Sequence, residues 1–225
     1  MKQIIPDLYY ITGLPVGRVY CIKDADGLTL IDSSISGMTG RIQSQIESAG
    51  FSITDVKRLL VTHAHPDHIG SLFELQRRSG AQVITSEQDR AVVEGKSPVA
   101  RRAAGFRPPQ TYIKGTSVTR VVHEGDVISE AFGGLHVLFT PGHSPGHLTF
   151  WQPQKRVGFC GDVIFHMFGL RPPFGFLTVD AAQNKRSIAK VAALDARIMC
   201  FGHGDPLTEN TSSKISAFAH SVGAA

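Results

Sequence analysis

The chain has 225 residues, of which 42% are hydrophobic and 19% are charged, and its formal net charge is +4. This length and composition predict one globular domain over residues 1–225. The sequence contains no apolar run long enough to span a membrane, and residues 1–20 lack the pattern of a signal peptide. The charge is mild, and we expect a small-molecule substrate and neither a nucleic acid nor a membrane as partner.

The cysteines and histidines indicate where the chain works and what it binds. Cys21, Cys160 and Cys200 lie in apolar, strand-like runs without the spacing of a disulfide framework. They are therefore expected to be free, buried thiols in a reducing cytoplasm. Ten histidines are many for this length, and several fall in loop motifs, which favours metal binding over pH sensing.

Strands alternate with helices in the first half of the chain. Residues 8–11, 19–22 and 28–31 are predicted strands, with a hairpin turn at Asp26-Gly27. The polar cluster at 32–34 can cap a helix over 35–49, which Gly50 ends. Further strands are expected at 56–61 and 82–85. Helices are expected at 69–78, ended by Gly80, and at 86–94, capped by Ser86.

A loop at residues 62–68 holds three histidines and an aspartate within six positions, namely His63, His65, Asp67 and His68. Pro66 is unsuited to a central strand and common in the first turn of a helix, so the loop follows a strand and precedes a helix. Ligands gather at such places in open α/β structures. Imidazole and carboxylate groups ligate zinc and similar ions. This loop can therefore hold two metals side by side, and a chance histidine-rich surface loop is the alternative.

Residues 95–117 differ from the rest of the first half, because glycine and proline are frequent there and the periodicity fades. The segment holds five basic residues and no acidic one: Lys96, Arg101, Arg102, Arg107 and Lys114. Two interpretations remain open. The segment is either a solvated loop or a cationic flap that attracts an anionic substrate.

The second half returns to strands, predicted at 118–122, 127–128, 135–139, 148–151, 157–160 and 197–201, with helices at 180–194 and 211–219. Three of these strands run into a metal-type ligand beside glycine or proline, namely His143, Asp162 and His203. Together with the strand before His63, four apolar strands end in this way, which is hard to attribute to chance. The repeated order of strands and helices predicts two halves that form one sheet-on-sheet core with helices outside.

The order of these ligands resembles the metallo-β-lactamase fold superfamily, whose fingerprint is His-x-His-x-Asp-His followed by a distant His, an Asp and a His. The resemblance covers nearly the whole chain, up to Gly202-His203-Gly204. It implies an α/β fold, an αβ/βα four-layer sandwich, with two groups of metal ligands. The first ion would be bound by His63, His65 and His143, the second by Asp67, His68 and His203, and Asp162 would bridge both.

Two further residues gain a role from this resemblance. Asp32 would orient a ligand histidine, as outer partners of metal ligands commonly do. The family usually has Asp-Thr/Ser-Gly at this turn, whereas Ser34 replaces the glycine here. His147 lies four residues after His143 and matches a frequent family feature. We favour a structural or orienting role for it over direct ligation.

The implied chemistry is hydrolysis. Two divalent ions about 3.5–4 Å apart can share a hydroxide, which is a nucleophile at neutral pH. Zinc is favoured, with iron or manganese as alternatives. Asp67 would hold the hydroxide and pass on a proton, which makes it the predicted catalytic residue. We therefore expect cleavage of an ester-like bond in a lactone, thioester or related ester.

Other activities of the superfamily remain as alternatives. A bridging Asp162 resembles glyoxalase-II-like and lactonase-like members, whereas true β-lactamases generally lack that aspartate. The chain is expected to be too short for the extra helical domain of full glyoxalase II. A mononuclear iron persulfide dioxygenase, a β-lactamase or phosphodiesterase activity on the same site, and a non-catalytic metal-binding module are the other candidates. The complete ligand set argues against the last.

Residues 163–177 follow Asp162 directly and are rich in aromatic side chains. We expect this stretch to form part of the substrate-binding wall, through Phe165, His166, Phe168 and Phe176, although His166 can equally be an ordinary loop histidine. The competing interpretations are core packing and a contact in a homodimer. No residue here identifies the acyl group of the substrate.

Overall fold

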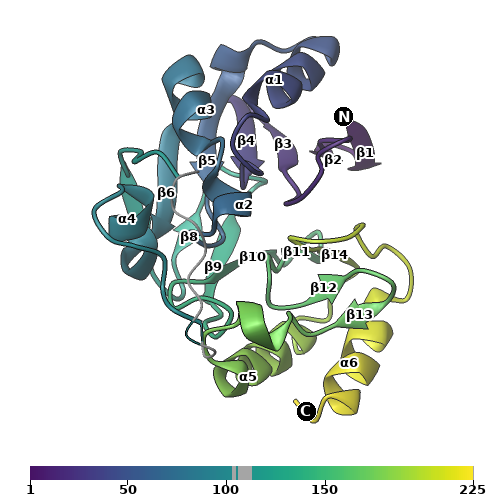
Figure 1. Cartoon of the computed structure of the whole chain (residues 1–225). Coiled ribbons are helices and arrows are strands. Elements are labelled where there is room, and N and C mark those ends of the chain that lie inside the picture. Colours follow the sequence, from purple (N-terminus) through teal and green to yellow (C-terminus); the bar gives the residue numbers. More distant parts are fainter. Residues whose placement is uncertain (103–104, 106–112, 225) are drawn as a thin grey trace.

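Two β-sheets stack face to face, and helices cover the outer side of each (Figure 1). The computed structural model describes residues 1–102, 105 and 113–224. The αβ/βα sandwich that the ligand order implied is confirmed. None of the helices in these residues is long and apolar enough to cross a membrane.

The first sheet follows chain order. Its strands are β1 (Lys2–Ile5), β2 (Leu8–Tyr10), β3 (Tyr20–Asp24), β4 (Gly27–Ile31), β5 (Val56–Leu60), β6 (Gln82–Ser86) and β7 (Arg120–Val122). The pairs from β1 to β4 are antiparallel, and those from β4 to β7 are parallel. Parallel neighbours need crossover connections, and the helices lie in these: α1 (Thr39–Ser48), α2 (Pro66–Ile69), α3 (Leu72–Ser79) and α4 (Glu87–Val93).

The second sheet has the order β14-β11-β10-β9-β8. Its strands are β8 (Val127–Ile128), β9 (Leu135–Phe139), β10 (Leu148–Gln152), β11 (Val157–Phe159) and β14 (Ile198–Cys200). Only β11 and β14 pair in parallel, and helix α5 (Ala181–Ala192) lies in their connection. Helix α6 (Thr211–Ser221) follows β14, and a small ribbon is formed by β12 (Phe165–His166) and β13 (Leu170–Arg171).

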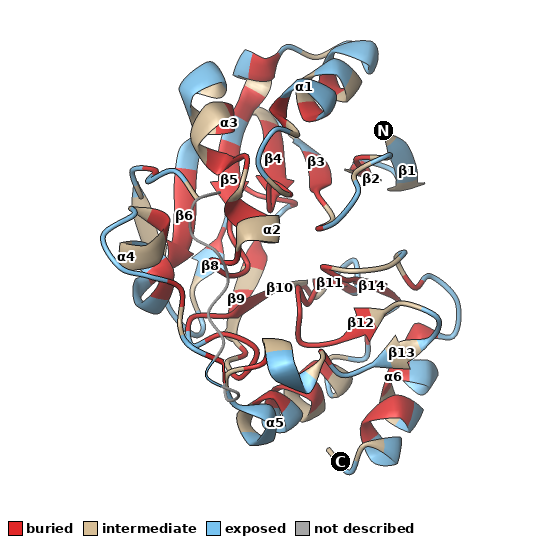
Figure 2. Ribbon diagram, viewed as in Figure 1, coloured by how far each residue is buried: buried red, intermediate tan, exposed pale blue. Residues whose placement is uncertain are grey.

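The core follows from the alternation of side chains along the strands. In β3, Tyr20 and Ile22 face the second sheet, whereas Cys21 between them faces the helices. In β5, Leu60 faces the second sheet and Leu59 the helices. Figure 2 shows these central strands mostly buried, with exposed surfaces on the outer helices. Each sheet is therefore apolar on both faces. The three cysteines are free and buried, as expected.

The predicted helix over 35–49 was wrong at its start. Helix α1 begins at Thr39, because Ser34 and Gly37 have φ of +60° and +88°, which a right-handed helix cannot accept. The polar cluster at 32–34 therefore does not cap it. The predicted helix over 69–78 corresponds to α3, which begins at Leu72, and the separate short helix α2 before it already contains Asp67 and His68. Strands β1, β12 and β13 were not expected.

Candidate metal centre

The side chains singled out as metal ligands come from the connections at one edge of the two sheets. The connection after β5 carries four of them, His63 and His65 in the loop and Asp67 and His68 in the short helix α2, and the loops after β9, β11 and β14 carry one each. Backbone hydrogen bonds hold these loops together: Leu148 N–H donates to Thr62 O at 2.8 Å, and Gly202 N–H donates to Gly161 O at 2.8 Å. The first of these joins the two sheets directly beside the histidine loop.

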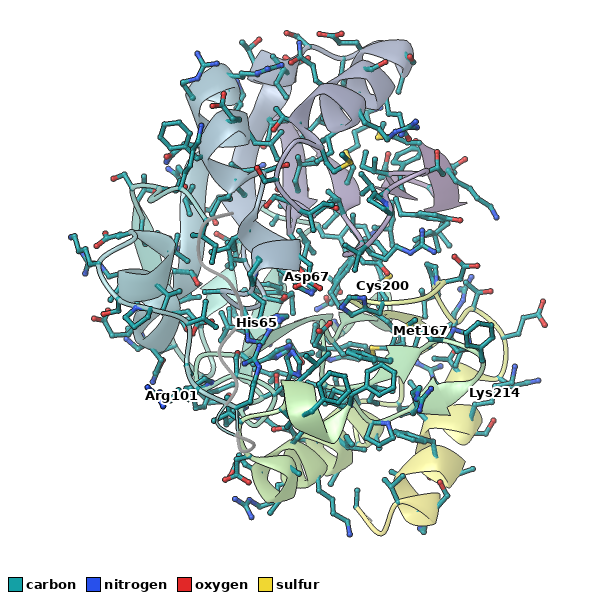
Figure 3. The ribbon with its side chains drawn as sticks, in the orientation of Figure 1. His65, Asp67, Arg101, Met167, Cys200 and Lys214 are labelled. Atoms are coloured by element: carbon teal, nitrogen blue, oxygen red, sulfur yellow. The ribbon has the colours of Figure 1, made fainter. Side chains whose placement is uncertain are left out.

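All seven predicted ligand side chains converge at this edge. One group consists of His63, His65, His143 and Asp162, all buried, and the second consists of Asp67, His68 and His203. Within each group the candidate ligand atoms lie within 4.8 Å of one another. Figure 3 labels His65 of the first group and Asp67 of the second, which lie between the two halves of the ribbon. The histidines and Asp67 divide as the resemblance implied, while Asp162, expected to bridge both ions, falls in the first group.

The spacing of the ligand atoms suits metal ions. His143 Nε2 lies 3.0 Å from His65 Nδ1 and 3.1 Å from Asp162 Oδ2. His203 Nε2 lies 3.2 Å from Asp67 Oδ2 and 3.2 Å from Asp162 Oδ2. Ligands at zinc–nitrogen distances of about 2.0–2.1 Å in a tetrahedron are about 3.3 Å apart. The observed distances therefore match ligand atoms arranged around ions.

Several of these atoms are buried without a hydrogen bond among the described residues. His63 Nε2, His68 Nε2 and Asp162 Oδ1 have no hydrogen-bond partner among the described residues. A buried polar atom without a partner costs free energy, and native proteins rarely leave one. Ligation of divalent ions would satisfy all three atoms, so the residues fit the metal ions that the fold family implies.

Asp32 orients the predicted ligand His68 by contacting the ring nitrogen that faces away from the ligand group. Its Oδ2 lies 2.8 Å from both His68 Nδ1 and Thr62 Oγ1, and its Oδ1 accepts a hydrogen bond from Thr62 N–H at 2.8 Å. A proton on His68 Nδ1 leaves the Nε2 lone pair free for an ion. Ser34, in place of the family's glycine, adopts φ +60° and donates from Oγ to Val16 O. The turn thus keeps a left-handed backbone without glycine.

We expect Asp32→Asn to weaken binding of the second ion. The asparagine amide would donate toward His68 Nδ1, which would move the histidine proton to Nε2 and remove the ligand lone pair. Loss of such an outer partner typically lowers metal affinity by about 10- to 100-fold. Zinc titration followed by elemental analysis measures this loss. Asp126→Asn is the matched control, because Asp126 also lies beside a histidine, 3.6 Å from His123 Nδ1, but at the surface. Equal zinc affinity in the two variants would contradict the role of Asp32.

His147 holds the backbone of the Asp162 loop. Its Nε2 accepts a hydrogen bond from Asp162 N–H at 2.9 Å, and its Nδ1 lies 3.0 Å from Thr140 Oγ1. Both ring nitrogens are therefore engaged, and His147 belongs to neither ligand group. Burial, with His143 nearby, lowers its pKa to about 3, so the ring is neutral. This arrangement suits the orienting role expected for His147.

Asp89 was not identified from the sequence. It is buried, its Oδ2 accepts a hydrogen bond from Ala64 N–H at 2.8 Å, and Gly146 N–H also donates to it. A side chain at Gly146 would collide with this carboxyl group. Burial raises the pKa of Asp89 to about 6. Asp89 thus links the loop of His63 and His65 to the loop of His143. This role could not be recognised in the sequence, because an acid in the first turn of a helix is common.

A cavity of about 420 Å³ opens beside both ligand groups. Its polar lining includes His65, Asp67, Arg102, His143, Asp162 and His203, and its apolar lining includes Val16, Ile35, Pro66, Phe165, Met167, Phe174 and Leu177. A volume of this size and a mostly apolar wall with a few convergent polar groups are usual for a small-molecule site. The aromatic stretch 163–177 therefore does contribute to a wall, through Met167, Phe174 and Leu177 and, of the four residues predicted for it, through Phe165.

The other three residues expected in this wall do not line the cavity, which corrects the prediction. His166 follows Phe165 on β12 and points the other way, where its Nδ1 lies 2.7 Å from Asp205 O. Phe168 is fully exposed at the turn between β12 and β13, with φ +57°. Phe176 is exposed and stacks on Phe174. A dimer contact through Phe168 and Phe176 stays a prediction.

The basic segment 95–117 contains cations of two kinds. Lys96 and Lys114 are exposed and pair with acids outside the segment, Lys96 with Glu94 at 2.6 Å and Lys114 with Glu74 at 3.5 Å. Arg101 is exposed, whereas Arg102 is only 4% exposed and lines the cavity. Arg107 lies outside the described residues. The two lysines fit a solvated surface, and Arg102 does not.

The two ligand groups differ in protonation. Burial holds the pKa values of His63, His65 and His143 below the ordinary value of a histidine. Burial acts in the same sense on His203, but Asp162 and Asp67 outweigh it and raise its pKa to about 9. Asp162, Asp32 and Asp67 likewise outweigh burial at His68 and raise its pKa. The first group is therefore neutral in its histidines at pH 7, while the second carries protons on His68 and His203 that an ion must displace.

We expect binding of the second ion to release at least one proton at pH 7 and binding of the first ion to release none. Because the pKa values of His68 and His203 are raised, the apparent affinity for the second ion should increase by at least about tenfold per pH unit between pH 7 and pH 9. Calorimetric titration of the metal-free protein in two buffers of different ionisation enthalpy counts the protons. A binding heat that is the same in both buffers for the second ion would contradict this assignment.

Comparison with known proteins adds to this geometry. Residues 12–203 match the model of a family described as the metallo-beta-lactamase superfamily. A probable metallo-hydrolase of Bacillus subtilis, YybB, is 27% identical over 198 residues, which cover 88% of this chain and 84% of that protein. The hydroxyacylglutathione hydrolase GloC of Haemophilus influenzae is 29% identical over 148 residues, and these cover 63% of each chain. The matched stretch is thus less than two thirds of that enzyme.

A solved structure extends the match to the whole fold. BJP-1, a subclass B3 metallo-beta-lactamase of Bradyrhizobium japonicum, superposes with a TM-score of 0.74 at 26% identity. The superposition covers 97% of this chain and 89% of that chain. The likeness therefore includes both sheets and the four loops that carry the ligand groups.

Proposed function

Because this chain belongs to the metallo-beta-lactamase superfamily and is a metal-dependent hydrolase, we propose that it cleaves an ester-like bond in a small-molecule substrate, a lactone, thioester or related ester. The observation that carries the proposal is the convergence of seven ligand side chains in two groups beside one cavity. The match to hydroxyacylglutathione hydrolases, which are named for a thioester substrate class, supports the choice of bond.

In this proposal the two groups would hold two zinc ions, and Asp162 would serve both groups. When bound, such ions supply a water nucleophile at neutral pH and polarise the oxygen of the bond under attack. Asp162 Oδ2 is 3.1 Å from His143 Nε2 of the first group and 3.2 Å from His203 Nε2 of the second. A carboxylate in contact with both groups is what a bridging ligand requires.

Asp67 is the proposed catalytic residue. It lines the cavity and is more exposed than Asp162, so it can reach both the substrate and water. Its pKa is lowered, because His68 and His203 outweigh the effect of burial. An ionised carboxylate at this place can orient the nucleophile by accepting its hydrogen bond, and can later pass a proton to the leaving group.

The remaining residues of the cavity position the substrate and limit the access of water. Phe165, Phe174 and Leu177 offer an apolar surface to the part of the substrate that does not react. His147 keeps the Asp162 backbone in place through its hydrogen bond to Asp162 N–H. When the nucleophile and the substrate are both fixed in position, less entropy is lost on reaching the transition state, and the reaction is faster.

Hydrolysis of β-lactams is the second candidate, because the chain superposes on the subclass B3 enzyme BJP-1. The position of Asp162 between the two ligand groups favours the ester-like substrates instead. A mononuclear iron dioxygenase is less favoured, because the second group offers three ligands of its own in Asp67, His68 and His203.

A substrate screen tests the proposal. Zinc-loaded protein is assayed with lactones, thioesters, aryl esters, phosphodiesters and β-lactams, with Asp162→Asn as the inactive control. We expect the highest kcat/KM on a thioester, lactone or aryl ester. Oxygen uptake by iron-loaded protein with a persulfide, in the absence of any hydrolysis, would refute the proposal.

A further inference from the structure

Arg102 is a buried cation without a partner among the described residues. Its Nε and Nη1 atoms are buried and make no hydrogen bond there, and no described carboxylate lies within 4.0 Å of the guanidinium. A guanidinium stays charged in a protein. A buried charge is costly unless it is paired and hydrogen-bonded. We therefore expect the buried guanidinium of Arg102 to bind an anion.

The location of Arg102 shows where such an anion would lie. Arg102 lines the same cavity as His65, Asp67 and Asp162. The carboxylates of Asp67 and Asp162 are near enough to act on its pKa, which burial lowers and they raise. Both carboxylates belong to the ligand groups, and bound ions would occupy them. The positive charge of Arg102 therefore remains available to a molecule in the cavity.

We propose that Arg102 binds a carboxylate of the substrate, so that the enzyme acts on an ester, thioester or lactone that carries a free carboxylate apart from the bond that is cleaved. The proposal rests on the proposed function. Arginine suits this task because its planar N–H groups can bind both oxygens of a carboxylate. The apolar residues Phe165, Phe174 and Leu177 would contact the hydrocarbon between the two polar ends.

The neighbouring residue provides a matched control. Arg101 has the same charge and lies in the same segment, but it is exposed, and Figure 3 shows it apart from His65 and Asp67. Replacing either arginine with glutamine removes one positive charge. Only the change at Arg102 removes a donor from the cavity. The two variants thus separate direct binding from attraction at long range, which salt screens over about 10 Å at 0.1 M.

A binding experiment that needs no turnover comes first. Dicarboxylates from malonate to adipate, and their monomethyl esters, are titrated into zinc-loaded protein by calorimetry, and the zinc content is measured afterwards. For the chain length that fits best, wild type should bind the dicarboxylate about 10- to 100-fold more tightly than the monoester, as a hydrogen-bonded charge pair allows. Arg102→Gln should abolish that preference and keep the monoester affinity, and Arg101→Gln should retain both.

Kinetics on matched substrates then extends the test. Monophenyl glutarate carries a free carboxylate, and phenyl methyl glutarate is its uncharged counterpart. Arg102→Gln should raise KM for the first and leave KM for the second and both kcat values unchanged, while Arg102→Lys should recover part of the affinity. Because the dicarboxylate titration measures binding alone, it can succeed even where these esters are not hydrolysed.

Three outcomes would overturn the role of Arg102. A lower melting temperature with equal loss for charged and neutral ligands would make it a structural residue. A fall in kcat for both esters would show that Arg102 stabilises the negative charge that develops at the reacting bond. Equal effects of Arg101→Gln and Arg102→Gln that vanish at high salt would leave only diffuse attraction. Hydrolysis of no ester by wild type, with the dicarboxylate preference intact, would refute the proposed function and not this inference.

Discussion

Replacing Asp162 with asparagine is expected to lower kcat/KM by more than about 100-fold, the upper end of the loss seen when only an outer partner of a metal ligand is removed. Asp162 lies in contact with the histidines of both groups, 3.1 Å from His143 Nε2 and 3.4 Å from His68 Nε2. Burial would raise its pKa, but His203 and His68 hold it well below the ordinary value, so the side chain is a carboxylate. Asparagine has nearly the same shape and no negative charge, so the Asp162→Asn variant should lose the ions.

The fold should survive this substitution. The backbone hydrogen bond from Asp162 N–H to His147 does not involve the side chain, and the preceding strand β11 packs through Val157 and Phe159. Zinc content, activity and melting temperature are measured for Asp162→Asn and for Asp195→Asn, a surface aspartate that pairs with Arg156 at 2.7 Å. Wild-type turnover with two zinc ions still bound would exclude Asp162 as a bridging ligand.

Removal of the metal ions is expected to abolish hydrolysis and to lower the melting temperature by on the order of 10 °C. A ligand present at 1,000 times its dissociation constant stabilises a fold by about 4 kcal/mol, and 1 kcal/mol changes the melting temperature by about 2–4 °C in a chain of this length. Without the ions, His63 Nε2 and His68 Nε2 remain buried with no partner among the described residues. Thermal unfolding before and after treatment with a chelator measures the change.

Restoration of the metal provides the control. Zinc added back to the metal-free protein should return both activity and melting temperature, and elemental analysis should give two ions per chain. A stoichiometry that stays at one after reconstitution, with full activity, would contradict the two-ion proposal. An unchanged melting temperature in the metal-free protein would show that the ligand groups are not coupled to folding.

The ligand groups could be predicted because their signals are local. Four ligands lie within six residues after one apolar strand, and His143, Asp162 and His203 each follow another such strand. An apolar strand must be buried, and a polar residue just beyond its carboxyl end lies at the sheet edge, where sites form. The family order then assigned these residues to two groups. Packing details play little part in this argument, which is why it could be made from the sequence.

Burial of single polar residues could not be predicted in the same way. Asp89 looks like an ordinary acid in the first turn of a helix, and only the tertiary approach of Gly146 places it between two loops. Arg102 lies in a segment without periodicity, so the sequence does not distinguish it from the exposed Arg101. The start of α1 was missed because Ser34 adopts a left-handed conformation that serine rarely shows.

The side on which an aromatic residue lies depends on register, and a short ribbon gives little indication of it. Phe165 and His166 are adjacent on β12 and therefore point to opposite sides. Phe168 lies in the turn that follows, where nothing packs against it. The position of this stretch directly after Asp162 placed it beside the ligand groups, but its composition could not tell the side chains of the wall from those of the surface.

Each ligand group combines residues from both halves of the chain, and this has a consequence for biosynthesis. A ribosome releases the histidine loop of residues 63–68 long before His143, Asp162 and His203 are made. An emerging chain therefore offers only part of either group, and an ion captured at that stage lacks the ligands from the second half. Tight retention has to await the docking of the two sheets, which requires contacts between residues far apart in the sequence and is slow for that reason. Only the folded state thus offers either group in full.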